Sequence, residues 1–401
     1  MLLEILIALF LGILVGTFTG LFPGIHINLI GVLLVSFAST IFFKIPPIYL
    51  VIFIVAIAIA HTFLDFIPSI FLGCSNTETE LSLLPGHELL KQGKGYQAVM
   101  FSAYGGLIAL FLFALISYPS IKFIPKIYEI LTKEKYIMAV VLIALTLFLI
   151  LTESNKLRAT IVILLSGILG YSVLNLETLK QPLFPLLTGL FGVSSLILSI
   201  KTKTKIPEQE FSKPEIDKKS FLKTSLASLI SSPLCGFLPG LGSGQAAILG
   251  SSIVKTDKKS FLMLLGLTNI LVMGISFLAL YAIEKTRTGA AVAVKELLGN
   301  FEYPTLILII AVIIISGIIS FFLTKYLSII FAKNINKFNY SKLSLIIIGI
   351  LFILTFIFSG ILGILILIIS TFAGIYFIQL EVRRTGMMGC LLIPTIIYYL
   401  F

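Results

Sequence analysis

Long apolar runs separated by short charged segments make up most of the chain. Eleven runs contain no Asp, Glu, Lys or Arg, and they cover residues 5–43, 45–64, 95–121, 136–152, 159–176, 181–200, 224–254, 260–283, 303–324, 343–380 and 385–401. A helix that crosses about 30 Å of hydrocarbon needs roughly 20 residues. The pattern therefore predicts an all-α polytopic integral membrane protein.

Three of these runs are too long for a single crossing. Each contains a glycine or a Pro-Gly pair at which a helix can end. The expected breaks lie at Pro23-Gly24, at Pro239-Gly240, and near Gly360 and Gly363. When the three runs are divided at these breaks, the sequence predicts seven membrane segments in the first half of the chain and seven in the second.

Residues 201–223 form the longest hydrophilic stretch, with seven lysines and four acidic residues. They separate a predicted first membrane repeat (1–200) from a second one (224–401). If this linker is cytoplasmic and the segments alternate, the inner loops carry 20 Lys and Arg residues and the outer loops carry 9. Cationic loops favour the cytoplasmic side. We therefore expect a multi-pass protein of the cytoplasmic membrane, with both termini outside.

The composition supports this class and excludes others. Charged residues make up 12% of the chain and apolar residues 58%, whereas a soluble domain carries about 25% charged residues. This excludes a soluble protein and a disordered one. The net charge of +11 is explained by cationic loops at the inner face of the membrane, and it does not require a nucleic-acid partner. Three widely spaced cysteines, Cys74, Cys235 and Cys390, indicate neither a disulfide framework nor a metal site.

One short motif occurs twice. The pattern G-x-x-P-G is found at residues 20–24 and 236–240, each time inside the first long apolar run of its half. Each half contains an odd number of predicted segments, so a duplicated unit would be inverted in the membrane. The sequence thus predicts two inverted-topology repeats, each with a Pro-Gly-broken, re-entrant helical hairpin. Two ordinary proline-kinked helices are the alternative interpretation.

The residues after each break are unusually polar, and they form the candidate substrate site. Backbone groups freed at a break cannot face lipid, so they must line a cavity enclosed by protein. The half-helix that follows presents free N–H groups and a positive dipole end, which suit an anion. The candidate substrate-binding residues are Pro23, Gly24, His26, Asn28, Pro239, Gly240, Ser243 and Gln245, together with Ser75, Asn76 and Thr77 from a polar stretch.

Ionisable residues within the apolar segments are candidates for ion coupling. His61 and Asp65 are four residues apart, so they share one face of a helix. Such residues at mid-depth often relay protons, although a pair that only fixes helix packing is equally compatible with the sequence. Glu78 and Asn269 are the other candidates, and the coupling ion would be Na+ or H+. No metal and no other cofactor are expected.

The sequence contains none of the common enzyme signatures. HExxH, GxSxG, GxxxxGK[ST] and GxGxxG are all absent, and we expect no catalytic residues. A transporter without an ATP site would be a secondary one, or would be powered by a separate subunit. An intramembrane enzyme built on His61, Asp65 and Glu78 is the alternative from another class, but no set of nucleophile, base and orienting group emerges.

Four segments resemble one family of transport proteins. They read GTFTGLFPGIHINLIGVLL, LLPGHELLKQGKGYQAV, GFLPGLGSGQAAILGSSIV and ALYAIEKTRTGAAVAV. These segments are similar to the large membrane subunit of the tripartite tricarboxylate transporters, and the last one to its archaeal branch. The resemblance implies a permease of inverted repeats that takes up small carboxylates by symport with an ion. Its implied partners are a small membrane subunit and an extracytoplasmic solute-binding protein.

A polyprenyl-phosphate translocase is the alternative within membrane transport. Those proteins also use duplicated Pro-Gly re-entrant hairpins. The N-terminus of a half-helix suits a phosphate head group as well as a carboxylate. The ligand would then be a lipid phosphate in place of a small organic anion, and the protein would need an opening toward the lipid.

Overall fold

The structure is a computed structural model of the chain. It describes all residues except 1, 23–34, 36–44, 73–78, 180, 202–206, 239–240, 255, 287 and 335–339. In the described part, the chain forms helices joined by turns and extended segments, with no strand. The predicted all-α class is therefore confirmed for these residues.

The described helices follow one another in a simple order. They are α1 (Leu2–Leu21), α3 (Pro47–Leu64), α4 (Phe66–Leu72), η1 (Glu80–Ser82), α5 (Leu83–Lys91), α6 (Gly95–Thr132), α7 (Lys135–Leu151), α8 (Lys156–Leu174), α9 (Leu183–Leu187), η2 (Thr188–Val193), α10 (Ser194–Lys201), α11 (Lys218–Phe237), α12 (Ser243–Ile253), α13 (Lys258–Ile283), α14 (Gly289–Leu298), α15 (Tyr303–Asn334), α16 (Tyr340–Gln379), η4 (Arg384–Met388) and α17 (Gly389–Leu400). The element η2 is a π-helix, and η1 and η4 are 3₁₀-helices.

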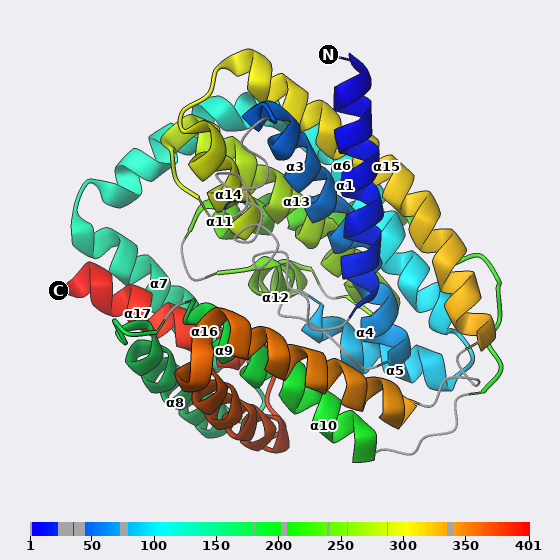
Figure 1. Cartoon of the computed structure of the whole chain (residues 1–401), viewed down its shortest axis with the longest axis vertical. Coiled ribbons are helices and arrows are strands. Elements are labelled where there is room, and N and C mark those ends of the chain that lie inside the picture. The colour runs from blue at the N-terminus through cyan, green and yellow to red at the C-terminus, as the bar shows by residue number, and fades with distance from the viewer. Residues whose placement is uncertain are drawn as a thin grey trace.

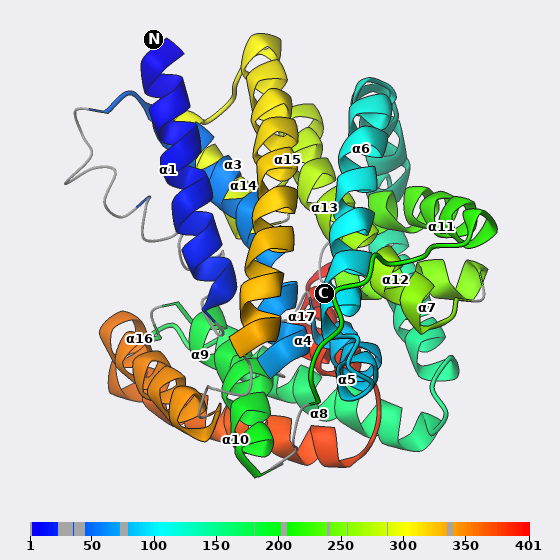
Figure 2. The same cartoon turned by 90° about the vertical axis from the view of Figure 1, so that its right-hand side faces the viewer.

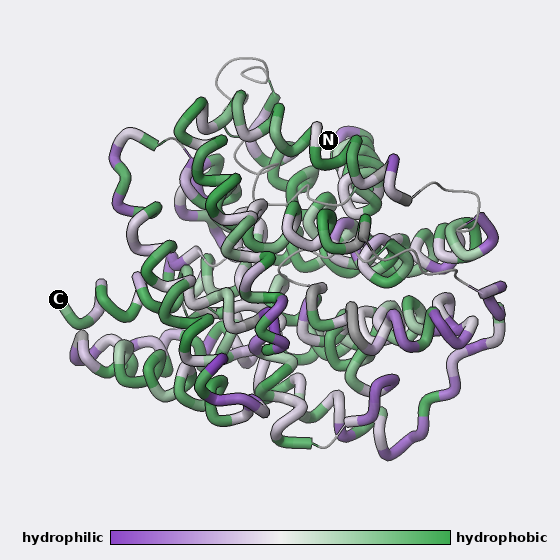
Figure 3. Tube along the Cα trace, turned by 90° about the horizontal axis from the view of Figure 1, so that it is seen from below, coloured by the Kyte–Doolittle hydropathy of each residue, from purple (hydrophilic) through white to green (hydrophobic). Residues whose placement is uncertain are grey.

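Within the part of the chain that the structure describes, seven helical spans are long and apolar enough to cross a membrane. They are Leu2–Leu21, Pro47–Leu72, Gly95–Thr132, Lys156–Leu174, Lys258–Ile283, Tyr303–Asn334 and Ser344–Gln379. Figure 3 shows that these helices are mainly hydrophobic, and that the strongly hydrophilic stretches lie largely in the connecting segments. A multi-pass membrane protein is therefore the class that the described helices support.

Fewer of the described helices can cross than the fourteen segments predicted from hydropathy. A broken apolar run produces short helices, and α12 has 11 residues. At 1.5 Å per residue it is about 16 Å long, roughly half of the hydrocarbon thickness. The break expected near Gly360 is confirmed, because this residue has φ 65° and ψ −160° inside α16.

Two predicted loop segments prove to be helical. α6 continues to Thr132, past Pro119 and Pro125 and through the lysine-containing stretch after residue 121. α11 begins at Lys218, inside the predicted linker. Each predicted segment ends at a charged residue. A charged residue marks where a helix leaves the hydrocarbon, but the backbone hydrogen bonds of the helix can continue beyond it. Lysine side chains extend toward water from such helix ends.

The core of the molecule is the crossing of α6 and α13. A Cβ atom at Gly266 would lie 1.9 Å from the carbonyl oxygen of Ser102, and a Cβ atom at Gly105 would lie 2.1 Å from that of Met263. The two backbones can approach this closely only because both positions are glycine. Figure 2 shows α1, α15 and α6 standing side by side, with α16, α10 and α8 across their lower ends.

α1 and α3 run parallel to each other. Gly12 of α1 faces Ala56 of α3, and Gly16 faces Ala60, so the contacts advance along both helices in the same direction. Chain segments that follow one another usually pack antiparallel when the connection is short. α3 therefore begins at the end of the molecule at which α1 began.

α11 and α13 are parallel in the same way. The hydroxyl of Thr224 lies 3.9 Å from the sulfur of Met263, and a Cβ atom at Gly236 would lie 2.6 Å from the side chain of Ile275. The contacts again advance together along the two helices. The segment that contains α12 therefore leads from the far end of α11 back to the start of α13.

A repeated hexapeptide marks the beginning of both helices, and it was not used in the sequence analysis. DKKSFL occurs at residues 217–222 and again at 257–262. A carboxylate oxygen of Asp217 accepts a hydrogen bond from the backbone N–H of Ser220 at 3.1 Å, and Asp257 accepts one from Ser260 at 3.0 Å. Both are helix N-caps. The same cap followed by two lysines starts two parallel helices at one end of the molecule.

The second part of the linker is packed on the protein. Residues 207–217 form neither helix nor strand, and Gln209 is buried against the ends of α5 and α6. Its side-chain oxygen accepts a hydrogen bond from the N–H of Gly95 at 2.8 Å, and its side-chain nitrogen donates to the carbonyl of Leu90 at 3.2 Å. Gln209 thus satisfies backbone groups at a helix start and at a helix end.

Candidate functional site

The N-terminus of α12 lies near the middle of the long helix α13. A Cβ atom at Gly250 would lie 3.3 Å from Leu264, which fixes the register of the two antiparallel helices. Ser243 is seven residues earlier, or about 10 Å along α12. It therefore lies at the level of Leu271, near the midpoint of α13. In the view of Figure 1, α12 is seen near the middle of the molecule, and Figure 2 shows that it lies to one side, next to α11.

Buried polar groups gather at this level. Ser243 is 4% exposed, and Gln245 and Asn269 are each 2% exposed. The side-chain oxygen of Gln245 accepts a hydrogen bond from the N–H of Gly242 at 2.9 Å. Its side-chain nitrogen, the hydroxyl of Ser243 and both amide atoms of Asn269 have no hydrogen-bond partner within the described residues. Buried polar groups are normally paired, so these atoms are available to a ligand.

His61 and Asp65 lie at the corresponding break of the first half. Nδ1 of His61 is 3.2 Å from the hydroxyl of Thr19, near the end of α1. A Cβ atom at Gly20 would touch the backbone of His61 at 2.9 Å. Asp65 follows one turn later, and its backbone N–H donates to the carbonyl of His61 at 3.0 Å. Both side chains are buried, and Asp65 lies just beyond the level at which α1 ends.

A serine–threonine pair occupies matching places in the two halves. The hydroxyls of Ser69 and Thr79 are 2.6 Å apart, and those of Ser276 and Thr288 are 3.0 Å apart. Ser69 lies on α4 and Ser276 on α13, and in each pair the threonine precedes the next short helix, η1 or α14. These pairs leave no signal in the sequence, because their spacings of 10 and 12 residues match no helical or strand period.

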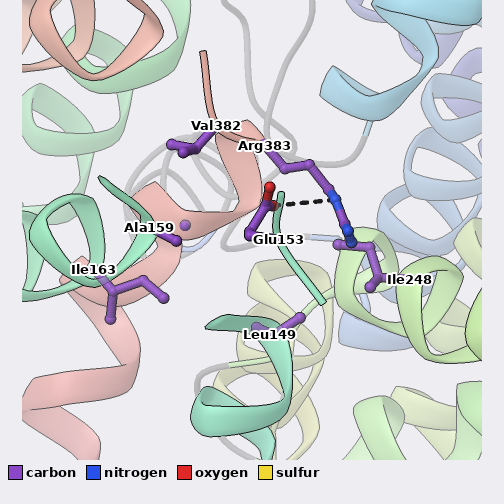
Figure 4. A pocket seen from close by; sticks show the side chains of 8 residues that line it. Leu149, Glu153, Ala159, Ile163, Ile248, Val382 and Arg383 are labelled. Atoms are coloured by element: carbon purple, nitrogen blue, oxygen red, sulfur yellow. Dashed lines mark ion pairs between the residues drawn. The ribbon is translucent and has the colours of Figure 1, made fainter. Parts of the chain in front are cut away.

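The short helix η4 and the residue before it contribute two arginines. Nε of Arg383 lies 3.0 Å from a carboxylate oxygen of Glu153, and its guanidinium also donates to the carbonyl of Thr152. Figure 4 shows this ion pair at a small pocket, lined by Leu149, Glu153, Ala159, Ile163, Ile248, Val382, Arg383 and Gly386. The pair joins the turn between α7 and α8 to the segment before η4. The sequence analysis treated both arginines only as inner-loop cations.

His87 of α5 is the titratable group with the largest resolved change among those outside the membrane spans. Burial, followed by the nearby cations of Lys91 and Arg384, lowers the pKa of His87 from 6.5 to about 4. Its Nε2 atom is buried and has no hydrogen-bond partner within the described residues. At neutral pH, the imidazole is therefore uncharged.

We expect stability to fall as the pH decreases from 6.5 to about 4. In this window the unfolded chain binds a proton at His87 and the folded chain does not, so protonation favours unfolding. A shift of this size corresponds to about 3 kcal/mol. His87→Gln should remove most of that loss when thermal unfolding in detergent is measured at pH 7 and pH 4.5. If the unfolding temperatures at pH 7 and pH 4.5 differ by the same amount in His87→Gln and in the wild-type protein, other groups dominate the loss of stability at low pH.

The structure describes only part of the predicted site. Ser243, Gln245 and Asn269 are placed at one level of α13, and His61 and Asp65 lie together near the end of α1. The remaining candidates lie outside the described residues: Pro23, Gly24, His26, Asn28, Ser75, Asn76, Thr77, Glu78, Pro239 and Gly240. No group of His, Cys, Asp and Glu that could hold a metal ion occurs within the described residues.

Comparisons with known proteins place the chain in a family. The sequence profile of the tripartite tricarboxylate transporter TctA family matches residues 6–389, which is nearly the whole chain. An uncharacterized protein of Methanocaldococcus jannaschii is 32% identical over 409 residues, which cover 98% of this chain and 99% of that protein. No solved structure matches the chain. The family predicted from the motifs is confirmed, and the chain belongs to the tripartite tricarboxylate transporter TctA family.

Proposed function

We propose that this chain is the permease subunit that moves a small di- or tricarboxylate across the cytoplasmic membrane, by alternating access coupled to an ion gradient. The family supports a non-enzymatic transport role. The observation that carries the proposal is the start of α12 halfway along α13, where Ser243, Gln245 and Asn269 are buried without partners for their polar atoms among the described residues.

The physical chemistry of this place favours an anion. The first N–H groups of a helix lack intrahelical partners, and the helix dipole adds partial positive charge there. The hydroxyl of Ser243 and the side-chain nitrogen of Gln245 add two donors. At the first break, Pro23, Gly24, His26 and Asn28 are proposed to complete the site, with Ser75, Asn76 and Thr77 beside them and with Pro239 and Gly240 at the second break.

The helix contacts support two inverted repeats, 1–200 and 224–401. α6 of the first half packs on α13 of the second, and α15 of the second packs on α3 of the first. α8 packs on α17 in the same way that α16 packs on η2. In each of these two cases, a contact between an element of the first half and one of the second half is matched by a contact between the equivalent elements of the other halves. A two-fold axis in the membrane plane would produce this arrangement. The two breaks are then the re-entrant hairpins of the two repeats.

Ion coupling is proposed to use residues mainly of the first half. His61 and Asp65 are buried ionisable residues within a membrane span, which in transporters usually serve an ion path. We propose that they bind the coupling ion, Na+ or H+, with Glu78 and Asn269 as further ligands. The linker 201–223 is proposed to be cytoplasmic and both termini to lie outside. The proposed partners are a small membrane subunit and an extracytoplasmic solute-binding protein.

Uptake by the full chain in proteoliposomes tests the proposal. With its companion subunits, the wild-type protein should accumulate a labelled di- or tricarboxylate when a Na+ or H+ gradient is imposed. Gln245→Leu removes a donor to a charged ligand, so the apparent KM should rise roughly 10- to 100-fold. Gln379→Leu is the matched control, because it makes the same change at an exposed position at the end of α16.

Two results would contradict the proposal. The first is carboxylate uptake with the same KM in the wild-type protein and in Gln245→Leu, which would remove the α12 site. The second is the absence of carboxylate uptake together with saturable binding of polyprenyl phosphate to the purified protein. That result would assign the paired breaks to a lipid phosphate.

A further inference from the structure

Arg384 lies at the start of η4, where segments from both halves meet. Its Nη1 donates a hydrogen bond to the hydroxyl of Ser195 at 2.8 Å. Ser195 is buried, and it belongs to α10, directly after the π-helix η2. π-helical turns are frequent at functional sites. η4 also packs against η1, which precedes α5.

The other end of η4 reaches the N-terminus of α12. The terminal methyl of Met388 lies 4.0 Å from the position of a Cβ atom on Gly242, which is the N-cap of α12. A 3₁₀-helix rises about 2 Å per residue, so Arg384 is about 8 Å from Met388 along η4. One short helix therefore connects the residue that carries the guanidinium group with the residue that contacts the N-cap of α12.

A neutral polar group lies near the same guanidinium. Arg384 is one of the two cations that act on His87, and the buried Nε2 atom of this imidazole has no hydrogen-bond partner within the described residues. Glu88, the next residue of α5, is paired with Lys258 at the start of α13. The region between η4 and α5 thus combines a permanent positive charge with a neutral imidazole.

We propose that Arg384 is a specificity-determining residue, which binds a second carboxylate of the substrate while the first lies at the N-terminus of α12. This inference rests on the proposed function. A guanidinium is always charged and holds a carboxylate through two parallel hydrogen bonds. Arg384 therefore gives the site its preference for anions with two or three carboxylates over those with one.

A purely structural role predicts a different pattern. If Arg384 only held η4 against α10 through Ser195, its replacement would disturb the site for every substrate equally. A specificity role predicts a loss that depends on the number of carboxylates. Ser195→Ala separates the two roles further, because it removes the hydrogen bond to α10 but retains the guanidinium.

Binding of acetate, succinate and citrate to the purified full-length chain in detergent tests the proposal. Arg384→Gln should raise the Kd for citrate and succinate roughly 10- to 100-fold and leave that for acetate within about twofold. Arg384→Lys keeps the charge but not the bidentate geometry. Its Kd for citrate should therefore lie between that of the wild-type protein and that of Arg384→Gln. The control is Arg158→Gln, an exposed arginine outside the site, which should leave all three Kd values unchanged.

An equal loss for acetate and citrate in Arg384→Gln, or no loss for either, would overturn the proposal. If Arg384→Gln does not fold, Arg384→Lys decides: an unchanged preference for citrate over succinate and acetate overturns it as well. The proposed function fails separately. If the wild-type chain binds none of the three carboxylates, the function itself is wrong, whereas binding with an Arg384-independent preference refutes only the role of this residue.

Discussion

Gly266→Ala is expected to prevent the normal packing of α13 against α6. The added Cβ atom would lie 1.9 Å from the carbonyl oxygen of Ser102, which belongs to the backbone and cannot rotate away. The two helices would have to separate by more than 1 Å along their whole contact, because the interior is close-packed. We expect a loss of about 4 kcal/mol or more, at the upper end for a single substitution.

The yield of monodisperse protein and the thermal unfolding temperature in detergent measure this loss. Gly349→Ala is the matched control, because it adds the same methyl group to a helix where nothing lies within 4 Å. That variant should unfold at the wild-type temperature or slightly above it, since alanine favours a helix. Equal unfolding temperatures for Gly266→Ala and the wild-type protein would contradict the close crossing of α6 and α13.

Arg383→Ala is expected to have the second largest effect, because it leaves Glu153 without its cation. The side chain of Glu153 is 11% exposed, and its carboxylate lies 3.0 Å from Nε of Arg383. Removal of one partner from a largely buried ion pair costs about 3–5 kcal/mol, since the remaining charge is poorly solvated. The segment before η4 would also lose the hydrogen bond to Thr152.

A double-mutant cycle in detergent isolates this pair. Glu153→Gln in the Arg383→Ala background should recover part of the lost stability, because it removes the unpaired charge. Arg158→Ala serves as the control: this arginine and Glu381 are exposed and 3.9 Å apart, so the change should be within about 1 kcal/mol. Additive effects of the two changes at Arg383 and Glu153 would show that the pair contributes nothing to stability.

The helix start within the predicted site was predictable because its signal is local. Pro-Gly followed by polar residues predicts a helix that starts inside an apolar run, and α12 begins at Ser243, three residues after Gly240. Ser243 and Gln245 were therefore identified from the chain alone. Arg384 and His87 carry no comparable signal, because each lies in a charged segment that resembles an ordinary loop. Only the contacts of η4 and α5 distinguish them from other cationic residues.

The parallel course of α11 and α13 shows a similar limit. The repeated DKKSFL was available in the sequence, and its capping aspartate and lysine pair indicate two helices that start at the same side. Hydropathy alone treats the intervening apolar run as two crossings or as one hairpin. The length of α12 and its contacts with α13 decide how far the chain returns.

The sequence by itself determined the membrane class, the helical content and the family. A bilayer requires about 20 apolar residues per crossing and a backbone whose hydrogen bonds are satisfied within the segment. Both requirements concern residues that are close together in the sequence, so they can be judged from the sequence alone. Tertiary structure alone decided the crossing at Gly105 and Gly266, the packing of α12 on α11 and α13, and the neighbours of Arg384. In lipid, helices are held together by close packing and polar pairing, and these join residues far apart in the chain that share no periodic signal.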